Sequence, residues 1–470
     1  MPFEPFQMGR RPQKVAEQLR SRYGCMNALR GAICINPARA RGHLCAMSEC
    51  RVQTERSYLL RLALVIAFTA LVCARLPDVS QHGRFWAEEG RLFYYRASTM
   101  PWHEALLAPF AGYLNLSASA AAIIARYTVP VEYAPWVTTG LGLLAQCCPA
   151  VILVTSSDVW LRSRLVLVGG LLIIATAPLC EEIWLQTIGA QFHLTLCCAL
   201  ILALDVPKAG RRWFRYVLLF LGPLSGPSAI ALIPLFLVKS VIEKEWARLS
   251  QCIVIIAGGL IQLVGFYGHE AGRSYGIAPT ILVCVIFIKH LVVPLAGKEI
   301  ASNESFKIRE LIAVHRYPVW QVFITAGAFA LLAATLTFKR AKPAIWLFTS
   351  ACVLAIISYY GAINGGQRLL LIGNDERYSF VPEVLVALSL LNVAGSARPH
   401  FFSNSYPNGI VAWLSRAIVV WLIAVGCQDV ASPISGSAHG PNWRHEIELW
   451  RRDHTHKIAI WPQGWFMSLN

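Results

Sequence analysis

Residues 58–74 read YLLRLALVIAFTALVCA, an apolar run about long enough to cross the hydrocarbon core of a membrane as a helix. Similar runs recur along almost the whole chain, which has 470 residues, 56% of them hydrophobic and only 14% charged. Soluble proteins average about 25% charged residues. The sequence therefore predicts an all-α, polytopic transmembrane helical bundle. It argues against a β-barrel, whose strands alternate in hydrophobicity over about ten residues.

The later apolar segments cover residues 112–125, 136–155, 165–180, 190–206, 216–238, 251–267, 279–296, 318–338, 344–362, 378–394 and 410–428. Counting spans forward from the first segment and backward from the basic turn near Arg340 gives conflicting orientations unless one segment is a half-helix. We consider residues 112–125 or 279–296 for this half-helix. We therefore expect about ten to twelve spans, with short re-entrant or half helices among them.

The segment 216–238 has basic loops on both sides, and both loops favour the cytoplasm. One straight helix cannot satisfy both. The sequence GPLSGPSAIALIP, residues 222–234, offers a break that would turn the segment into a re-entrant pair. An ordinary kinked helix with one positive loop outside is the alternative.

Charge sets the expected topology. Residues 1–57 are rich in Lys and Arg, so we expect a cytoplasmic and disordered N-terminal segment, with Met47 leaving a later start open. The first loop, residues 76–112, is then extracytoplasmic. The turn at Arg340 is cytoplasmic, Asn374 is outside, and the tail 429–470 is extracytoplasmic. The net charge of +16 lies in short loops and does not indicate nucleic acid.

Two adjacent carboxylates, Glu88 and Glu89, lie in the first loop within the stretch FWAEEGRLFYYRA, residues 85–97. Carboxylates close to a bilayer are often functional, so we take them as the candidate catalytic groups. The alternative is that they are solvated loop charges beside an interfacial belt of aromatic residues.

No GxxxxGK[ST], GxGxxG, HExxH or GxSxG signature is present. Four N-terminal cysteines, Cys25, Cys34, Cys45 and Cys50, have no CxxC spacing, which makes a zinc site improbable. No loop approaches the size of a catalytic domain. A substrate that reaches Glu88 and Glu89 must therefore arrive on the outer side of the membrane.

The stretches WAEEGRLFYYRA and PFAGYLNL in the first loop, with LSGPSAIALIP and ERYSFVP further on, resemble bacterial members of the GT-C superfamily of integral membrane glycosyltransferases. The likeness is architectural over about residues 55–430. It implies a GT-C-like fold, a cell-membrane location that is the inner membrane of a bacterium, and transfer of a sugar from a polyprenyl-phosphate donor to an extracytoplasmic glycan or glycolipid acceptor. Membrane lipids are the other expected partners.

In that superfamily the first-loop acid acts as base on the acceptor hydroxyl or binds a metal, and here those roles fall on Glu88 and Glu89. The WAEEG motif lacks an aspartate, which leaves a divalent metal cofactor open. The other candidate residues would bind substrate or lipid phosphate. They are Arg377, Arg368, Arg91, Tyr378, Trp86, Tyr113, Asn115, Glu182, Gln191 and His193.

Arg377 is the first choice as the phosphate-binding cation, and a headgroup anchor is its alternative role. For His193 a structural role competes with sugar binding. We expect Glu88 or Glu89 to share one cavity with Arg377 and part of residues 181–193. We also expect the two glutamates to be inequivalent, with Glu89 facing the cavity because Gly90 lets a ligand approach.

Two other functions stay open: a flippase for lipid-linked glycans and a non-catalytic accessory membrane protein. Transporters often have inverted repeats and place charged groups near the bilayer midplane. Here the acids lie in a loop and no repeat is apparent.

Overall fold

The structure is a computed structural model. It describes residues 58–469 except 208–209, 211, 268–275, 340, 363–365, 374, 397–405 and 433–438, and the backbone alone at 396 and 406–408. The expectations for residues 1–57, Arg340 and Asn374 lie outside the described residues. Contacts divide the chain into residues 1–63 and 64–470, and everything below concerns the second unit, except for the start of the first helix, residues 58–63.

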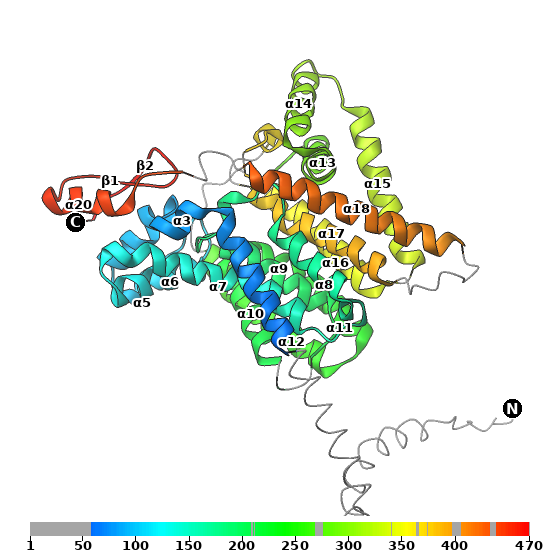
Figure 1. Cartoon of the computed structure of the whole chain (residues 1–470), viewed down its shortest axis with the longest axis horizontal. Coiled ribbons are helices and arrows are strands. Elements are labelled where there is room, and N and C mark those ends of the chain that lie inside the picture. The colour runs from blue at the N-terminus through cyan, green and yellow to red at the C-terminus, as the bar shows by residue number, and fades with distance from the viewer. Residues whose placement is uncertain are drawn as a thin grey trace, which may run out of the picture. The chain divides into compact units, whose positions relative to one another are not determined.

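The described elements are almost all helices (Figure 1). After a first helix, Tyr58–Arg75, they are α3 Pro77–His82, η1 Glu89–Tyr94, α4 Tyr95–Thr99, α5 Trp102–Leu107, α6 Leu116–Thr128, η2 Val131–Tyr133, α7 Ala134–Thr155, η3 Val159–Arg162, α8 Arg164–Ala175, η4 Glu181–Ile183, α9 Ala190–Ala203, α10 Arg212–Ser225, η6 Pro227–Leu232, α11 Ile233–Glu243, α12 Trp246–Tyr267, α13 Pro279–Phe287, η7 Ile288–Val292, α14 Val293–Ala313, α15 Val319–Phe338, α16 Lys342–Tyr360, η8 Gly366–Leu370, α17 Arg377–Ser396, α18 Tyr406–Ala431, α20 Trp443–Arg452, β1 Ile458–Ile460 and β2 Trp465–Met467.

Eight helices of the described part are long and apolar enough to cross a membrane: the first helix, α7 with η2, α12, α13 with α14, α15, α16, α17 and α18. The all-α class of a multi-pass membrane protein agrees with this finding, whereas the number of spans stays a prediction. Three expected segments form shorter helices. α6, α8 and α9 have 13, 12 and 14 residues, or about 20 Å at 1.5 Å per residue, against a hydrocarbon core of about 30 Å.

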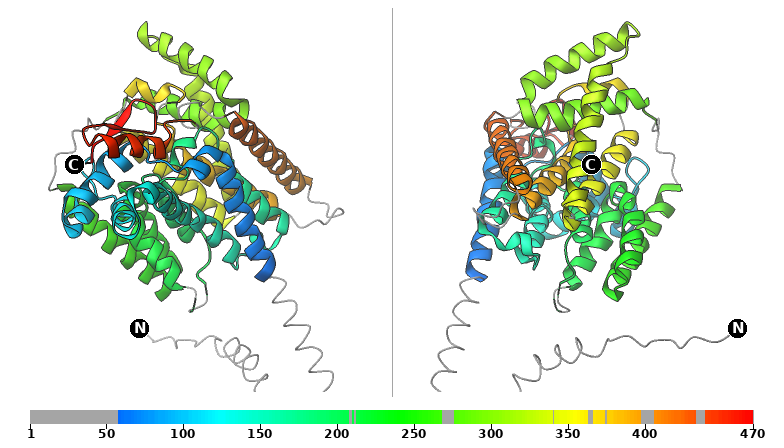
Figure 2. Two further views of the ribbon diagram at one scale, coloured as in Figure 1. Left: turned by 60° about the vertical axis from the view of Figure 1, so that its left-hand side comes forward. Right: turned by 90° about the vertical axis from the view of Figure 1, so that its right-hand side faces the viewer.

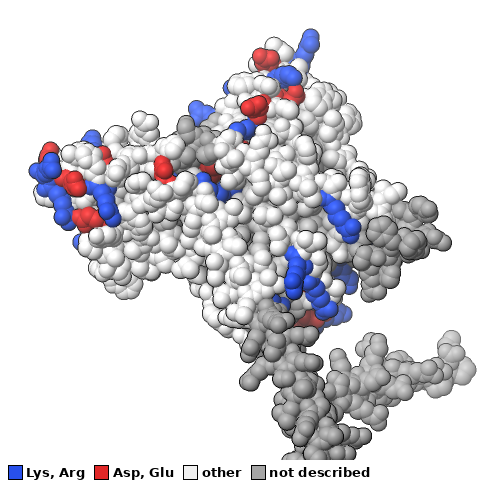
Figure 3. All heavy atoms as spheres, viewed as in Figure 1, with Lys and Arg blue, Asp and Glu red and all other residues white. Residues whose placement is uncertain are grey.

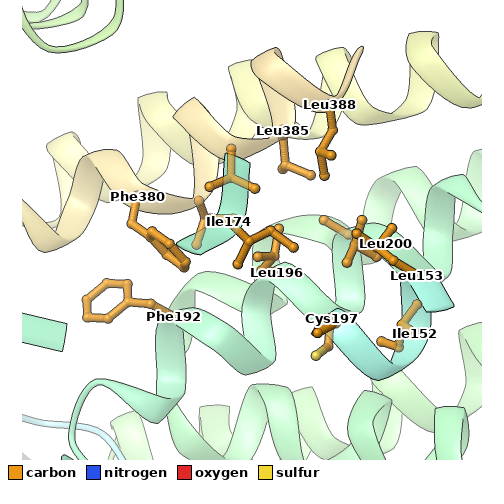
Figure 4. Close-up of a cluster of buried hydrophobic side chains, with 14 of the residues drawn as sticks. Ile152, Leu153, Ile174, Phe192, Leu196, Cys197, Leu200, Phe380, Leu385 and Leu388 are labelled. Atoms are coloured by element: carbon orange, nitrogen blue, oxygen red, sulfur yellow. The ribbon is translucent and has the colours of Figure 1, made fainter. Parts of the chain in front are cut away.

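The core is built around α9, in which every residue is buried. A helix that is apolar all round needs neighbours on all sides, and α7, α10, α16 and α17 supply them. Figure 4 shows Cys197 and Leu200 of α9 among side chains from α7, α8 and α17. At the edge of the bundle lie α14 and α15, yellow-green in Figure 2, and only 17% of α15 is buried.

The expected break in segment 216–238 is present: α10 ends at Ser225, and a 3₁₀ turn leads into α11. The basic ends of the two helices meet at the same place. Arg215 donates to the carbonyl of Asp205 at 2.7 Å, and Lys239 donates to that of Leu202 at 2.6 Å. The segment therefore returns to the end of α9 from which it started, as two helices joined by a turn, and its re-entrant placement in the membrane stays a prediction.

Two basic residues that the sequence treats as topology signals have a structural role as well. Lys239 and Arg248 are 3% exposed and bind the last carbonyl groups of α9 and of the residue after it. Cations at the C-terminal end of a helix satisfy its unpaired carbonyl groups.

On the face shown in Figure 3, charged side chains gather over the tail around α20, near α14 and at the lower end of the bundle, and large areas of the remaining surface are uncharged. The tail also pairs with the first loop. Trp461 donates its N–H to the carbonyl of Phe85 at 3.1 Å, and Ala87 donates to that of Trp461. The C-terminal residues therefore form part of the structure that holds Glu88 and Glu89.

Candidate functional site

The glutamate pair follows a strained residue. Ala87 has φ 37°, a conformation that costs an alanine energy and is held here by the pairing with Trp461. Glu88 then precedes and Glu89 begins η1, whose π-helical turn is a form that occurs often at functional sites. Because consecutive residues of a helix point in different directions, the two carboxylates have different surroundings.

Glu89 is fully buried and has three hydrogen-bond donors. The N–H of Thr187 donates to its Oε1 at 2.9 Å, the hydroxyl of Thr187 donates to the same oxygen, and the N–H of Trp86 donates to Oε2 at 3.2 Å. Burial raises the pKa of Glu89, whereas these bonds and the nearby Arg84 oppose the rise. Glu89 is therefore a fixed internal acceptor.

Glu88 lines a cavity of about 280 Å³. Its wall comes from the first loop, the start of α9 and the residue Ile188 before it, the tip of the broken segment, the end of α16 and the start of α17. The lining residues are Glu88, Phe110, Tyr113, Ile188, Gln191, Phe192, Pro227, Ser228, Ile357, Ser358, Tyr360, Gly361, Arg377 and Tyr378. Five of them are aromatic, and a carboxylate, a guanidinium and several hydroxyl groups lie between the rings.

The motif PFAGYLNL builds one side of this wall. Phe110 and Tyr113 exchange backbone hydrogen bonds of 2.7 and 3.0 Å around Ala111 and Gly112, which both have positive φ. Such a tight turn needs positive φ at both central positions, and it explains the glycine. The buried side chain of Gln262 in α12 then bonds both backbone groups of Leu114 at 2.9 Å, which fixes the loop to the bundle.

Arg377 lies at the start of α17 and is held by two carboxylates. Its Nη2 lies 2.6 Å from Oδ1 of Asp375, its Nη1 lies 3.6 Å from Oε2 of Glu182, and its backbone N–H donates to Glu182 at 3.1 Å. A guanidinium has five N–H groups, so these contacts leave donors for an anion. The same carboxylates reduce the positive charge that an anion would meet.

The structure thus brings Glu88, Arg377, Tyr378, Tyr113 and Gln191 into one cavity, with Glu182 behind Arg377. The expectation that Glu89 faces the cavity is wrong, because Thr187 and Trp86 draw its carboxylate into the protein and Glu88 takes that place.

The other candidates lie away from the lining. Arg91 and Arg368 are exposed on the surface, with Arg91 against Trp465. Trp86 stacks on Arg84, with 4.6 Å from the guanidinium carbon to the ring centroid. None of these three side chains lines the cavity, so their assignment to it is corrected.

Asn115 and His193 are also absent from the lining. Asn115 caps α6, accepting from Ala118 N at 3.2 Å. His193 is fully buried between Trp184 and Phe380, with ring centroids 4.7 and 4.8 Å away. This placement of His193 agrees with a structural role and not with sugar binding.

Sequence reasoning missed Thr187 and the buried ion pair of Lys289 with Glu376. Lys289 Nζ lies 2.8 Å from Oε2 of Glu376, the residue directly before Arg377. The backbone N–H of Gly373 donates to Oε1 of Glu376 at 2.8 Å. The charged pair Lys289–His290 inside the apolar run ILVCVIFIKHLVVPLA was the available signal, because ionisable residues inside a membrane segment usually have a function.

A divalent metal between Glu88 and Glu89 does not fit these residues. The Glu89 oxygens already accept from Thr187 and Trp86, and the carboxylate of Glu88 is at the cavity instead. Within the described residues there is no group of three or more His, Cys, Asp or Glu side chains placed to hold a metal ion.

No protein-family model matches the chain, and a search of curated proteins finds no match.

Proposed function

We propose that the protein is an integral membrane glycosyltransferase that moves a sugar from a polyprenyl-phosphate donor to an extracytoplasmic glycan or glycolipid acceptor. The observation that carries the proposal is the shared cavity of Glu88, Arg377 and Tyr378, which come from segments almost 300 residues apart in sequence. The resemblance of the first loop to GT-C enzymes supports it.

The chemistry assigns one role to each group. The acceptor hydroxyl oxygen attacks the anomeric carbon, the bond from that carbon to the phosphate oxygen breaks, and the lipid phosphate leaves with the electron pair. Glu88 takes the hydroxyl proton, as a general base must within hydrogen-bond reach of it. Arg377 donates to the departing phosphate oxygen. Negative charge then moves from the carboxylate of Glu88 to the lipid phosphate. Glu88 interacts with the attacking hydroxyl group, and Arg377 interacts with the leaving phosphate.

The size and lining of the cavity suit this substrate. At about 280 Å³ it is at the low end of ligand pockets and accommodates a sugar-sized group, so the lipid chain would extend beyond it. The rings of Tyr113, Phe192 and Tyr378 offer faces for a sugar, and Gln191 and Ser228 offer hydrogen bonds.

The test is Glu88→Gln, with Glu104→Gln as the control because Glu104 is a 55% exposed acid of the same loop. Each variant replaces the native protein in cells, and glycan composition and lipid-linked intermediates are measured by mass spectrometry. Loss of a general base lowers the rate by about a hundredfold or more. We therefore expect Glu88→Gln to lose one sugar from the product at unchanged protein level, and Glu104→Gln to retain it.

Other outcomes separate the alternatives. Accumulation of an inward-facing lipid-linked glycan in Glu88→Gln would indicate a flippase, and an unchanged glycan profile would indicate an accessory protein. Transfer of radiolabelled sugar by the purified protein in proteoliposomes, retained in Glu104→Gln and lost in Glu88→Gln, would establish the transferase directly.

A further inference from the structure

A second and larger cavity of about 430 Å³ lies against another part of α17. On α16, residues 357, 358, 360 and 361 line the first cavity, whereas Tyr359 points the other way and bonds His290, which lines the second. On α17, Arg377 and Tyr378 face the first cavity and Glu383 faces the second. The two cavities therefore have a common wall but different lining residues.

The walls of the second cavity are apolar and come from α8, η7, α14, α15, α17 and α18. Leu331, Leu414 and Leu295 of the lining are 71%, 47% and 43% exposed. They lie on helices of the apolar, membrane-spanning class, where exposed side chains face lipid. A ligand with a hydrocarbon chain can therefore enter from the membrane.

Five lining residues are polar, and three of them are satisfied by their own helices. The hydroxyl groups of Thr176, Thr335 and Ser415 each donate to a backbone carbonyl one turn back at 2.8 Å. The other two, Glu383 and His290, are only 9% and 6% exposed. Oε2 of Glu383 and Nδ1 of His290 are buried and have no hydrogen-bond partner among the described residues.

Glu383 also differs from the acids around it. Glu376 has its cation in Lys289 at 2.8 Å, and Asp429 has Lys298 at 3.5 Å. None of the ion pairs among the described residues includes Glu383, and neither Lys nor Arg lines the cavity. The charged form of a buried carboxyl group is costly without a counter-charge, so a cation that enters the cavity would stabilise that form.

We propose that this cavity is a second ligand site, which binds a single-chain amphiphile with a protonated amine as its head group. The ammonium group pairs with Glu383 and donates a further hydrogen bond to Nδ1 of His290, in the tautomer whose Nε2–H donates to the Tyr359 hydroxyl. The hydrocarbon chain lies along the apolar wall toward the exposed leucines. An anionic lipid phosphate is disfavoured, so the site is distinct from that of the proposed sugar donor.

The test uses photoreactive octadecylamine, octadecanol and octadecyl phosphate in neutral phosphatidylcholine nanodiscs, with labelled peptides mapped by mass spectrometry. We expect saturable labelling of α15, α17 and α18 by the amine, at least tenfold stronger than by the alcohol or the phosphate. E383Q should remove that preference. The control is Glu310→Gln, an exposed acid on α14 outside the cavity, which should label as the native protein does.

A second variant tests the cavity itself. Ala387 lines it and is 5% exposed, so Ala387→Phe should fill the space and reduce labelling by all three probes. Equal labelling by amine and alcohol, preference for the phosphate, or an unchanged preference in E383Q would overturn the proposal. If E383Q fails to fold, the comparison of the three head groups on the native protein still tests the proposal. Binding is measured without turnover, and Glu88→Gln should leave it unchanged, so the result is independent of the proposed transferase activity.

Discussion

At the scale of single residues, the buried carboxylate of Glu89 holds together two segments that are far apart in sequence. Thr187 lies 98 residues away and provides both its N–H and its hydroxyl group to the same oxygen. Glu89 in turn fixes the start of η1, and with it the direction of its neighbour Glu88. The hydroxyl of Thr187 is therefore important for the position of the proposed base, although it does not line the cavity.

Thr187→Val removes this hydroxyl and keeps the shape of the side chain. Loss of one partner of a buried hydrogen bond costs about 1–3 kcal/mol, so the thermal midpoint of the purified protein should fall. The control is Thr128→Val, because Thr128 is exposed and its hydroxyl bonds only the carbonyl of Ile124.

The loss of stability in Thr187→Val should depend on pH. Burial raises the pKa of Glu89 above its ordinary value of 4.5, and the bonds from Thr187 oppose that rise by stabilising the charged form. Removing the hydroxyl raises the pKa further. The difference between Thr187→Val and the native protein should therefore be smallest below about pH 4.5 and increase as the pH rises. A difference that shrinks with rising pH would contradict this account.

At the scale of elements, the broken segment α10–η6–α11 places irregular backbone at the cavity. Its tip, Gly226 to Ser228, lies against Gln191, and a Cβ added at Gly226 would be 2.4 Å from Oε1 of that side chain. Non-helical backbone at membrane depth is tolerated where it is buried in protein or lines a cavity. The break is therefore part of the wall of the proposed site.

Gly226→Val should displace Gln191 and the tip together. Overpacking of this kind costs about 1–3 kcal/mol, and it should lower both the thermal midpoint and the yield of the glycosylated product. The control is Gly327→Val in α15, where no atom lies within 4 Å of the added Cβ. Native stability and native product in Gly226→Val would show that the tip does not shape the site.

The sequence predicted this element because its Gly and Pro residues and the charges at both ends are local signals. It did not predict that Lys239 and Arg248 are buried against the end of α9, since that depends on a helix some 40 residues earlier in the chain. The choice between Glu88 and Glu89 failed for the same reason. Local geometry predicts that the two glutamates differ, but which of them faces the cavity depends on the distant Thr187, which binds Glu89.

At the scale of the whole molecule, three parts of the chain must lie on one side of the membrane. The first loop and the start of α17 share the cavity through Glu88 and Arg377. The tail joins them through the pairing of Trp461 with Phe85. The distribution of Lys and Arg in the sequence predicts that this side is the outer one.

Reporters that are active only outside the cytoplasm should therefore give the same positive result after Ala97 and after Leu371. A reporter after Lys339, in the basic turn between α15 and α16, should be inactive. Opposite results at Ala97 and Leu371 would separate Glu88 from Arg377 and contradict the shared cavity. Activity at all three positions would instead show that the charge distribution does not set the orientation.

The cavity itself was predictable in part. The first-loop acids, Arg377 and Gln191 carry recognisable chemistry, and an expected common cavity followed from the topology. Ser228, Ser358 and Tyr360 of its lining carry no local signal, because they become neighbours only when α16 and the broken segment pack together. The second cavity had two signals, the acid Glu383 and the charged pair Lys289–His290, each inside an apolar run.

The pairing of Trp461 with Phe85 and Ala87 also bears on synthesis of the chain. A ribosome adds about 5–20 residues per second, so the first loop is made roughly twenty seconds or more before the strand that fixes it. During that interval Ala87 lacks its partner in the tail, so the backbone directly before the glutamates lacks one of the contacts that hold it.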